Sequence, residues 1–183
     1  MMLVQIVFAV FPPFAFSAPA QVILIRHGEK PPSGNELNDQ GRQRALALVK
    51  FFETNPTVTK FGTPVSIYAM CPKGPDGSLR PIETVTPLAR DLKININENF
   101  LKNETKEIVS DIMNNSAYNG KMILICWEHK AIPSIVSQFG WNPTPDWPGG
   151  DVFDRVWILN FTGNRVTSFQ DIPQHLLPGD SSN

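Results

Sequence analysis

Residues 21–30 read QVILIRHGEK, a short apolar run that is followed at once by charged and polar residues. The run itself, residues 21–25, is continuous and rich in β-branched side chains, which is typical of a strand buried on both faces of a sheet. Residues 65–69 (VSIYA) and 122–126 (MILIC) have the same character. The sequence therefore predicts three buried strands.

Helical patterns separate these strands. Ala45, Leu48, Val49 and Phe52 follow the spacing of one helix face, and Asn38 precedes them as a predicted N-cap. We expect further helices over residues 108–113 and 131–139, and a hairpin of residues 153–161 and 165–169. Strands alternating with helices indicate an α/β fold, here a three-layer α/β/α sandwich with a mostly parallel central sheet.

Polar side chains that suit a ligand follow each of the three predicted strands. In such sheets ligands bind beyond the carboxyl ends of the strands. Two arginines and two of the three histidines of the chain are expected to meet at this edge. We call them the cationic cluster: Arg26, His27, Arg80 and His129.

The chemistry of the cationic cluster suits a phosphoryl group. Guanidinium groups are permanent, planar donors for phosphate oxygens, and a neutral imidazole beside them can attack phosphorus to form a phosphohistidine. The sequence contains no P-loop, no Asp-rich metal cage and no nucleophilic serine elbow. A covalent route without metal or cofactor is therefore the simplest prediction.

Four segments resemble the histidine phosphatase superfamily, the phosphoglycerate-mutase-like enzymes. Residues 23–30 (ILIRHGEK) are similar to the Arg-His-Gly signature of that superfamily, and residues 37–45 (LNDQGRQRA) to its Leu-Thr-x-x-Gly-x-x-Gln-Ala helix start. Residues 80–84 (RPIET) and His129 match its second-arginine and second-histidine positions. The resemblance implies a histidine-phosphatase-like fold with His27 as the nucleophile. It also implies that Arg26, Arg80 and His129 bind phosphate, while Glu83 is structural.

The proton donor to the leaving group is less directly indicated. The acidic residue that follows the second histidine in one branch of the superfamily is replaced by Lys130. We predict Glu128 as the catalytic acid, on the premise that burial by Trp127 keeps its carboxyl protonated. The alternatives on the preceding loop and helix are Glu98, Glu104 and Glu107.

Lys30 is a candidate for a further phosphate contact, although a solvated surface lysine explains it equally well. The loop of residues 141–150 (WNPTPDWPGG) either lines the mouth of the site or covers the sheet, and we favour covering. Cys71 and Cys126 are interpreted as two small buried residues, although a disulfide between them is conceivable.

Length and charge limit the function classes. The chain has 183 residues, enough for one domain, and its net charge of −1 offers no field that would attract nucleic acid or an anionic membrane. The partner expected is a small phosphorylated substrate. We predict a phosphomonoester hydrolase of broad or unknown specificity. The alternatives are a phosphomutase built on the same core and a non-catalytic protein that binds phosphorylated ligands.

The amino-terminal segment contains no charged residue before Arg26. Residues 1–16 are almost wholly apolar, and the small residues of Ser17-Ala18-Pro19-Ala20 follow them, as in a signal peptide. We predict cleavage after Ala20, a secreted or periplasmic protein without stable membrane association, and a catalytic domain of residues 21–183. The alternative is that residues 3–10 form an extra strand or helix of the domain.

Overall fold

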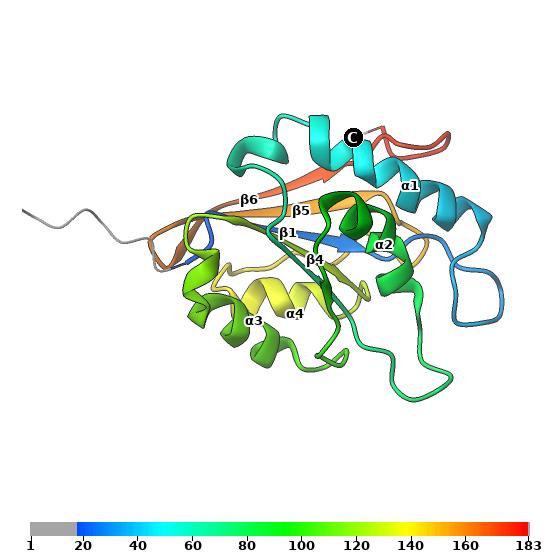
Figure 1. Ribbon diagram of the computed structural model, residues 1–183, viewed down its shortest axis with the longest axis horizontal. Coiled ribbons are helices and arrows are strands. Elements are labelled where there is room, and N and C mark those ends of the chain that lie inside the picture. Colours follow the sequence, from blue (N-terminus) through cyan, green and yellow to red (C-terminus); the bar gives the residue numbers. More distant parts are fainter. Residues whose placement is uncertain (1–17, 183) are drawn as a thin grey trace, which may run out of the picture.

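A computed structural model of the chain describes residues 18–182, and these form a single six-stranded sheet covered by helices (Figure 1). The strand order is β3-β2-β4-β1-β5-β6. Three neighbouring pairs are parallel, namely β3–β2, β2–β4 and β4–β1. Strand β5 pairs antiparallel with both β1 and β6. The strands are β1 (Gln21–Arg26), β2 (Ser66–Ala69), β3 (Ile96–Asn97), β4 (Met122–Trp127), β5 (Arg155–Thr162) and β6 (Arg165–Pro173).

The helices pack on both faces of this sheet, because successive side chains of a strand point to opposite sides. Ile23 and Ile25 of β1 pack in the same core cluster as residues of α1 and α2, whereas Val22 and Leu24 join residues of α3 and α4. The expected three-layer sandwich with a mostly parallel sheet is confirmed. The helices are α1 (Asp39–Thr54), α2 (Arg80–Leu92), α3 (Thr105–Asn114) and α4 (Ile132–Gln138), with single turns η1 (Thr59–Phe61) and η2 (Ser116–Tyr118).

The predicted elements match the observed ones except at the edges of the sheet. Strand β3 was not predicted, because two residues are too few to form a hydrophobic pattern. The hairpin begins at Arg155 and not at residue 153, since the ring of Phe153 packs against Arg26 instead of continuing the strand. Asn38 caps α1 as predicted, and its Oδ1 atom accepts a hydrogen bond from the Gly41 N–H at 2.8 Å.

Two glycines allow α1 to approach the loop that follows β1. A Cβ atom on Gly28 would lie 3.0 Å from the Cα and carbonyl oxygen of Gly41, and one on Gly41 would lie 2.5 Å from the carbonyl oxygen of Glu29. The distance at Gly41 is too short for a side chain, and the distance at Gly28 leaves almost no room for one. The first turn of α1 is thus held directly against the residues after His27.

The tryptophans of the 141–150 loop pack on the sheet, as favoured above. Trp147 lies 5.2 Å from Trp157 between ring centroids, and Trp141 stacks on Phe169 at 6.0 Å. Both cysteines are free thiols, and Cys126 is buried while Cys71 is only partly so.

The start of the described chain is part of the domain. The Ala20 N–H donates to the Lys121 carbonyl at 2.8 Å, and the carbonyl oxygens of Ala18 and Ala20 accept from Gly120 and Phe161 at 3.0 and 2.9 Å. Residues 1–17, which hold most of the predicted signal peptide and the alternative element of residues 3–10, lie outside the described residues. Within residues 18–182, no helix has both the length and the apolar character needed to cross a membrane.

Candidate active site

The cationic cluster is assembled by the pairing of β1 with β4. Arg26, the last residue of β1, lies in register with Trp127, the last residue of β4. The His27 N–H then donates to the Trp127 carbonyl at 3.2 Å. This bond fixes His27 beside the chain that continues into Glu128 and His129. The expectation that residues after separate strands meet at one edge is fulfilled for these positions.

His27 is a buried, neutral imidazole with one nitrogen committed to the backbone. Its Nδ1 atom lies 2.7 Å from the Gly28 carbonyl oxygen, and because a carbonyl only accepts, Nδ1 carries the proton. Burial is the main cause that lowers the pKa of His27, to about 4, and the charges of Arg26 and Arg80 act in the same direction, against the Gly28 hydrogen bond. The Nε2 atom therefore keeps its lone pair at neutral pH.

Arg26 is held on one side of His27 by the loop before β5. Its Nη1 atom donates to the Val152 carbonyl at 2.9 Å, and its guanidinium carbon lies 3.8 Å from the centroid of the Phe153 ring. The same ring lies 6.0 Å from the His27 ring. Burial lowers the pKa of Arg26 to about 10, so the group stays charged at neutral pH.

Arg80 is the first residue of α2 and faces the loop after β1. Its Nη1 atom donates to the Gly34 carbonyl at 2.9 Å. Burial lowers the pKa of Arg80, but a guanidinium stays protonated in proteins. Its charge lowers the pKa of both Arg26 and His27. Glu83 accepts the Leu37 N–H at 2.7 Å, which confirms a structural contact for this residue.

Glu128 lies at the same edge as His27, but in a different environment from the one predicted. Its Oε2 atom is 2.8 Å from Nζ of Lys102. Burial alone would raise the pKa of Glu128, yet Lys102, His129 and the Lys130 N–H outweigh it, so the pKa is lowered. The Trp127 ring does not shield this carboxyl, because it is buried in the core with α3 and α4. The premise that Trp127 keeps Glu128 protonated is therefore wrong.

His129 completes the cluster beside Glu128. Its Nδ1 atom lies 3.0 Å from Oε1 of Glu128 but forms no hydrogen bond, so the angle between the groups is unfavourable. Burial is the main cause that lowers the pKa of His129, and the nearby charge of Arg26 adds to it. A Cβ atom on Gly150 would lie 3.8 Å from the other ring nitrogen. The histidine thus lies between Glu128 and the loop that holds Arg26.

Three buried nitrogen atoms of the cluster form no hydrogen bond with the described residues: Arg26 Nε, Arg80 Nε and His129 Nδ1, the last of which lies 3.0 Å from Oε1 of Glu128. Buried polar atoms in folded proteins are nearly always hydrogen-bonded, and exceptions call for an explanation. Six buried side-chain atoms are unpartnered in the described part of the chain, and three of them belong to residues selected as phosphate ligands from the sequence; the others are on Gln21, Ser78 and Trp157. Unused donors on two guanidinium groups are what an anion site requires.

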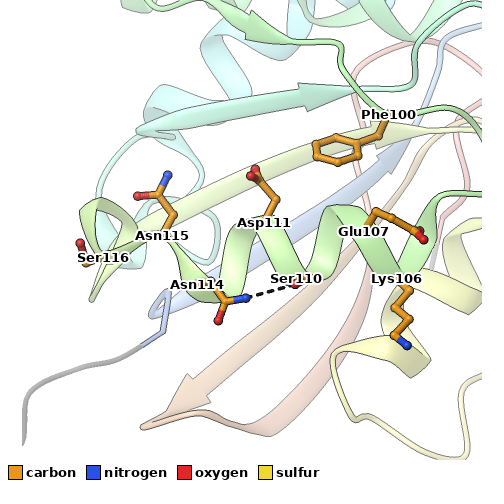
Figure 2. Close-up of a pocket in the computed structure, with 8 residues that line it drawn as sticks. All are labelled: Phe100, Lys106, Glu107, Ser110, Asp111, Asn114, Asn115 and Ser116. Atoms are coloured by element: carbon orange, nitrogen blue, oxygen red, sulfur yellow. Dashed lines mark hydrogen bonds between the residues drawn. The ribbon is translucent and has the colours of Figure 1, made fainter.

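No hydrogen bond or ion pair joins the remaining predicted residues to the cluster in the described part of the chain. Lys30 is exposed, and in the described part of the chain its side chain makes no contact with the cluster. Glu104 accepts the Leu101 N–H at 2.7 Å at the start of α3. Glu107 projects from α3 into a hollow of about 810 Å³ beside Phe100 and Asp111, shown in Figure 2. That hollow is lined by α3 and its flanking loops, and none of its lining residues belongs to the cationic cluster.

Sequence reasoning missed Lys102 and Phe153. Lys102 lies on the loop before α3, where the Trp127 Nε1 atom donates to its carbonyl at 3.0 Å. Phe153 was assigned to the hairpin, although it follows the Gly149-Gly150 pair that ends the tryptophan loop. Neither residue has a pattern in the sequence that links it to the cluster.

Comparison with known proteins identifies the fold. No family model and no curated protein sequence matches the chain. Among solved structures, the protein histidine phosphatase SixA complexed with tungstate is similar over 84% of this chain and 97% of its own, with a TM-score of 0.58 and 12% identity. A mycobacterial glucosyl-3-phosphoglycerate phosphatase covers 84% of this chain and 96% of its own, with a TM-score of 0.56 and 11% identity.

A phosphoglycerate mutase from Plasmodium falciparum is also similar, over 89% of this chain and 96% of its own, with a TM-score of 0.55 and 16% identity. These proteins share the arrangement of the sheet and its helices with this chain at low sequence identity. Together with the residues at the carboxyl ends of β1 and β4, they show that the chain has the fold of the histidine phosphatase superfamily.

Proposed function

We propose that the protein is a phosphomonoester hydrolase that works through a phosphohistidine on His27. The observation that carries this proposal is the state of His27: a neutral imidazole with its Nε2 lone pair unprotonated, next to two guanidinium groups with unused donors. Such a group is a nucleophile, and its neighbours stabilise the charge of a phosphoryl group during transfer. SixA, one of the similar structures, was solved with tungstate, a tetrahedral oxyanion like phosphate.

The first step transfers the phosphoryl group to His27. The Nε2 lone pair forms the bond to phosphorus while the bond from phosphorus to the ester oxygen breaks. Arg26, Arg80 and His129 donate to the equatorial oxygens, which carry the charge in the transition state. The leaving oxygen takes a proton from Glu128. The pKa of Glu128 is low in the free protein, and a bound phosphate dianion raises it, because like charges disfavour the ionised carboxyl.

The second step releases phosphate. Glu128, now ionised, accepts a proton from a water molecule whose oxygen attacks phosphorus, and the phosphorus–nitrogen bond breaks. His27 regains its neutral form with the proton still on Nδ1. Neither step uses a metal ion. We therefore propose a metal-independent mechanism that turns over small phosphorylated substrates.

A phosphomutase would share the first step and pass the phosphoryl group to a second hydroxyl instead of water. We favour hydrolysis, because the longest segment between two elements of the described chain, residues 139–154, contains no helix or strand and so forms no separate cap domain over the site. Two of the three similar structures described above are named as phosphatases and one as a mutase.

The test is hydrolysis of an activated aryl phosphate by the purified protein in the presence of a chelator. We expect free phosphate to appear, and the His27→Ala variant to lose turnover by at least about 10³-fold. Stopping the reaction with base should leave an acid-labile phosphoryl group on His27. A folded wild-type protein that releases no phosphate would contradict the proposal, as would full activity of His27→Ala.

We further propose that the protein is exported by its apolar leader and acts in the periplasm or outside the cell. The proposal is based on the apolar sequence of residues 1–17. The backbone hydrogen bonds of Ala18 and Ala20 to the domain suggest that the leader ends before Ala18. Amino-terminal sequencing of the exported protein tests it.

A further inference from the structure

The hydroxyl of Thr84 joins the nucleophile loop to the helix that carries the second arginine. Thr84 is fully buried in α2. Its Oγ1 atom accepts the Gly28 N–H at 2.8 Å and donates to the Arg80 carbonyl at 2.7 Å. One hydroxyl therefore contacts the residue after His27 and the backbone of Arg80.

Gly28 in turn controls the protonation of His27. Both backbone groups of Gly28 are engaged: its N–H with Thr84 and its carbonyl oxygen with Nδ1 of His27, at 2.7 Å. A glycine has no side chain to restrict its backbone, so the close approach of Gly41 and these hydrogen bonds hold the carbonyl toward the imidazole. The hydrogen bond from the Gly28 N–H to Thr84 fixes the peptide group between His27 and Gly28.

Other hydrogen bonds join the loop after His27 to the start of α2, but they do not involve Gly28. The Arg80 side chain bonds to the Gly34 carbonyl, the Leu79 N–H to the Asn35 carbonyl, and the Leu37 N–H to Glu83. These contacts attach the later part of the loop to the start of α2. The hydroxyl of Thr84, in contrast, bonds to Gly28, the residue next to His27.

We propose that Thr84 is a positioning residue that sets the tautomer of His27. Its hydroxyl holds Gly28 so that the glycine carbonyl keeps the proton on Nδ1 and leaves the lone pair on Nε2. The same hydroxyl keeps Arg80 in a fixed place relative to His27. The consequence for phosphoryl transfer rests on the proposed function, whereas the consequence for the tautomer depends on the geometry alone.

Three variants separate the hydroxyl from the shape of the side chain. Thr84→Val keeps the shape and removes the hydroxyl, and Thr84→Ser keeps the hydroxyl. Thr86→Val is the matched control, because Thr86 lies on the same helix and its hydroxyl donates only to the Ile82 carbonyl, at 2.8 Å. Should Thr84→Val not fold, as judged by circular dichroism, Thr84→Ala serves as the second variant without a hydroxyl.

The first readout is the ¹⁵N NMR signature of the His27 ring at neutral pH, which distinguishes the proton on Nδ1 from the proton on Nε2. We expect the wild type, Thr84→Ser and Thr86→Val to show the proton on Nδ1. Thr84→Val should show a larger fraction with the proton on Nε2. An unchanged tautomer in a folded Thr84→Val or Thr84→Ala would overturn the proposal.

The second readout is turnover of the aryl phosphate. We expect kcat/KM of Thr84→Val to fall by about 10- to 100-fold, the range for an unpaired buried N–H group, with Thr84→Ser close to the wild type. Equal losses in Thr84→Ser and Thr84→Val would also overturn the proposal, since packing and not the hydroxyl would then be responsible. If the wild type has no activity while the tautomer still responds to Thr84→Val, the proposed function fails and the positioning role stands.

Discussion

The Oε2 atom of Glu128 lies 2.8 Å from Nζ of Lys102, and this ion pair adjoins His129 at the end of β4. The lysine lowers the pKa of the carboxyl that we propose as the proton donor. A general acid works best with a pKa near the operating pH. Lys102 is therefore expected to set the upper pH limit of activity.

Replacing Lys102 by Met removes the positive charge and keeps most of the side-chain length. The pKa of Glu128 should rise, so the decline of kcat at high pH should move to higher pH. The measurement is the pH profile of kcat for an alkyl phosphate. Lys106→Met is the control, because it removes a lysine on the outer side of α3. A profile that is the same in both variants would show that Lys102 does not act on the proton donor.

Replacing Glu128 by Gln tests the donor itself. Removal of a general acid costs about 10²–10⁴-fold in rate, and the cost is largest for leaving groups that need a proton. We expect turnover of alkyl phosphates to fall far more than turnover of activated aryl phosphates. If both substrate classes lose the same factor, Glu128 has no part in proton transfer, and Glu104→Gln is the next variant to measure.

The sequence allowed the layers of the fold and most of the cluster to be predicted. Successive side chains of β1 point to opposite faces of the sheet, as Val22 and Ile23 do. The continuous apolar run of residues 21–25 indicates that both faces are buried. Arg26, His27 and His129 were found because they lie at or just after the carboxyl ends of buried strands. Lys102 and Phe153 were not, because they belong to loops whose paths depend on packing far along the chain.

The error about Trp127 has a physical cause. Trp127 and Glu128 are neighbours in sequence, which suggested that the indole shields the carboxyl. The strand ends between them, so Trp127 points into the core with α3 while Glu128 lies in the following turn. Strand periodicity gives the direction of the last strand residue but not of the one after it.

The charges around His27 give a prediction for its titration. The pKa of His27 is lowered to about 4, mainly by burial, and Arg80 contributes to the lowering. In Arg80→Ala we expect the pKa of His27 to rise toward its usual value near 6.5. The measurement is the chemical shift of the imidazole carbon-bound proton as a function of pH.

The control for this titration is Arg90→Ala, on the exposed end of the same helix. It should leave the pKa of His27 unchanged. A histidine with a pKa below its unfolded value binds its proton more weakly in the folded state. The folded protein should thus lose stability as the pH falls from about 6.5 toward 4. Equal titration of His27 in wild type and Arg80→Ala would place Arg80 outside the cluster.

Arg44 is a second buried guanidinium, and it links the carboxyl-terminal segment to Glu29. Its Nη2 atom lies 2.6 Å from a carboxylate oxygen of Glu29 and 2.6 Å from one of Asp180, and its Nη1 atom donates to Gln174 at 2.9 Å. Replacing Arg44 by Met leaves two carboxylates without their partner. We expect a loss of about 3–5 kcal/mol in the free energy of unfolding, measured by urea denaturation.

The Arg44→Met result is compared with Arg42→Met, since Arg42 is half-exposed and its nearest carboxylates are 3.7 Å and 3.8 Å away. That change should cost less than about 1 kcal/mol. Similar losses in the two variants would show that the buried network does not stabilise the fold.

Asp180 makes the same network sensitive to acid. Burial acts to raise the pKa of Asp180, but hydrogen bonds from Arg44 and from the Leu176 and Leu177 N–H groups outweigh it, so the pKa is lowered. A carboxyl with a lowered pKa stabilises the folded state above its unfolded pKa, and this stability is lost as the pH falls below about 4. We expect Asp180→Asn to unfold with a weaker dependence on pH in this range. An unchanged pH dependence of unfolding would contradict the prediction.

The contacts of Ala18 and Ala20 predict where the mature chain begins if the leader is removed. Cleavage after Ala20 would delete three backbone hydrogen bonds to Gly120, Lys121 and Phe161. Cleavage after Ser17 keeps these bonds and leaves Ala15 and Ser17 as the small residues at the cleavage positions. We therefore expect amino-terminal sequencing of exported protein to begin at Ala18 and not at Gln21. A cytosolic protein that begins at Met1 would contradict export altogether.

The two possible mature chains can also be compared directly. A chain that begins at Ala18 should be more stable than one that begins at Gln21 by about 1.5–4.5 kcal/mol, because each of the three backbone hydrogen bonds contributes about 0.5–1.5 kcal/mol. Urea denaturation of both chains measures the difference. Chains of equal stability would remove the structural reason for the earlier cleavage site, and an amino terminus at Gln21 would then be compatible with the fold.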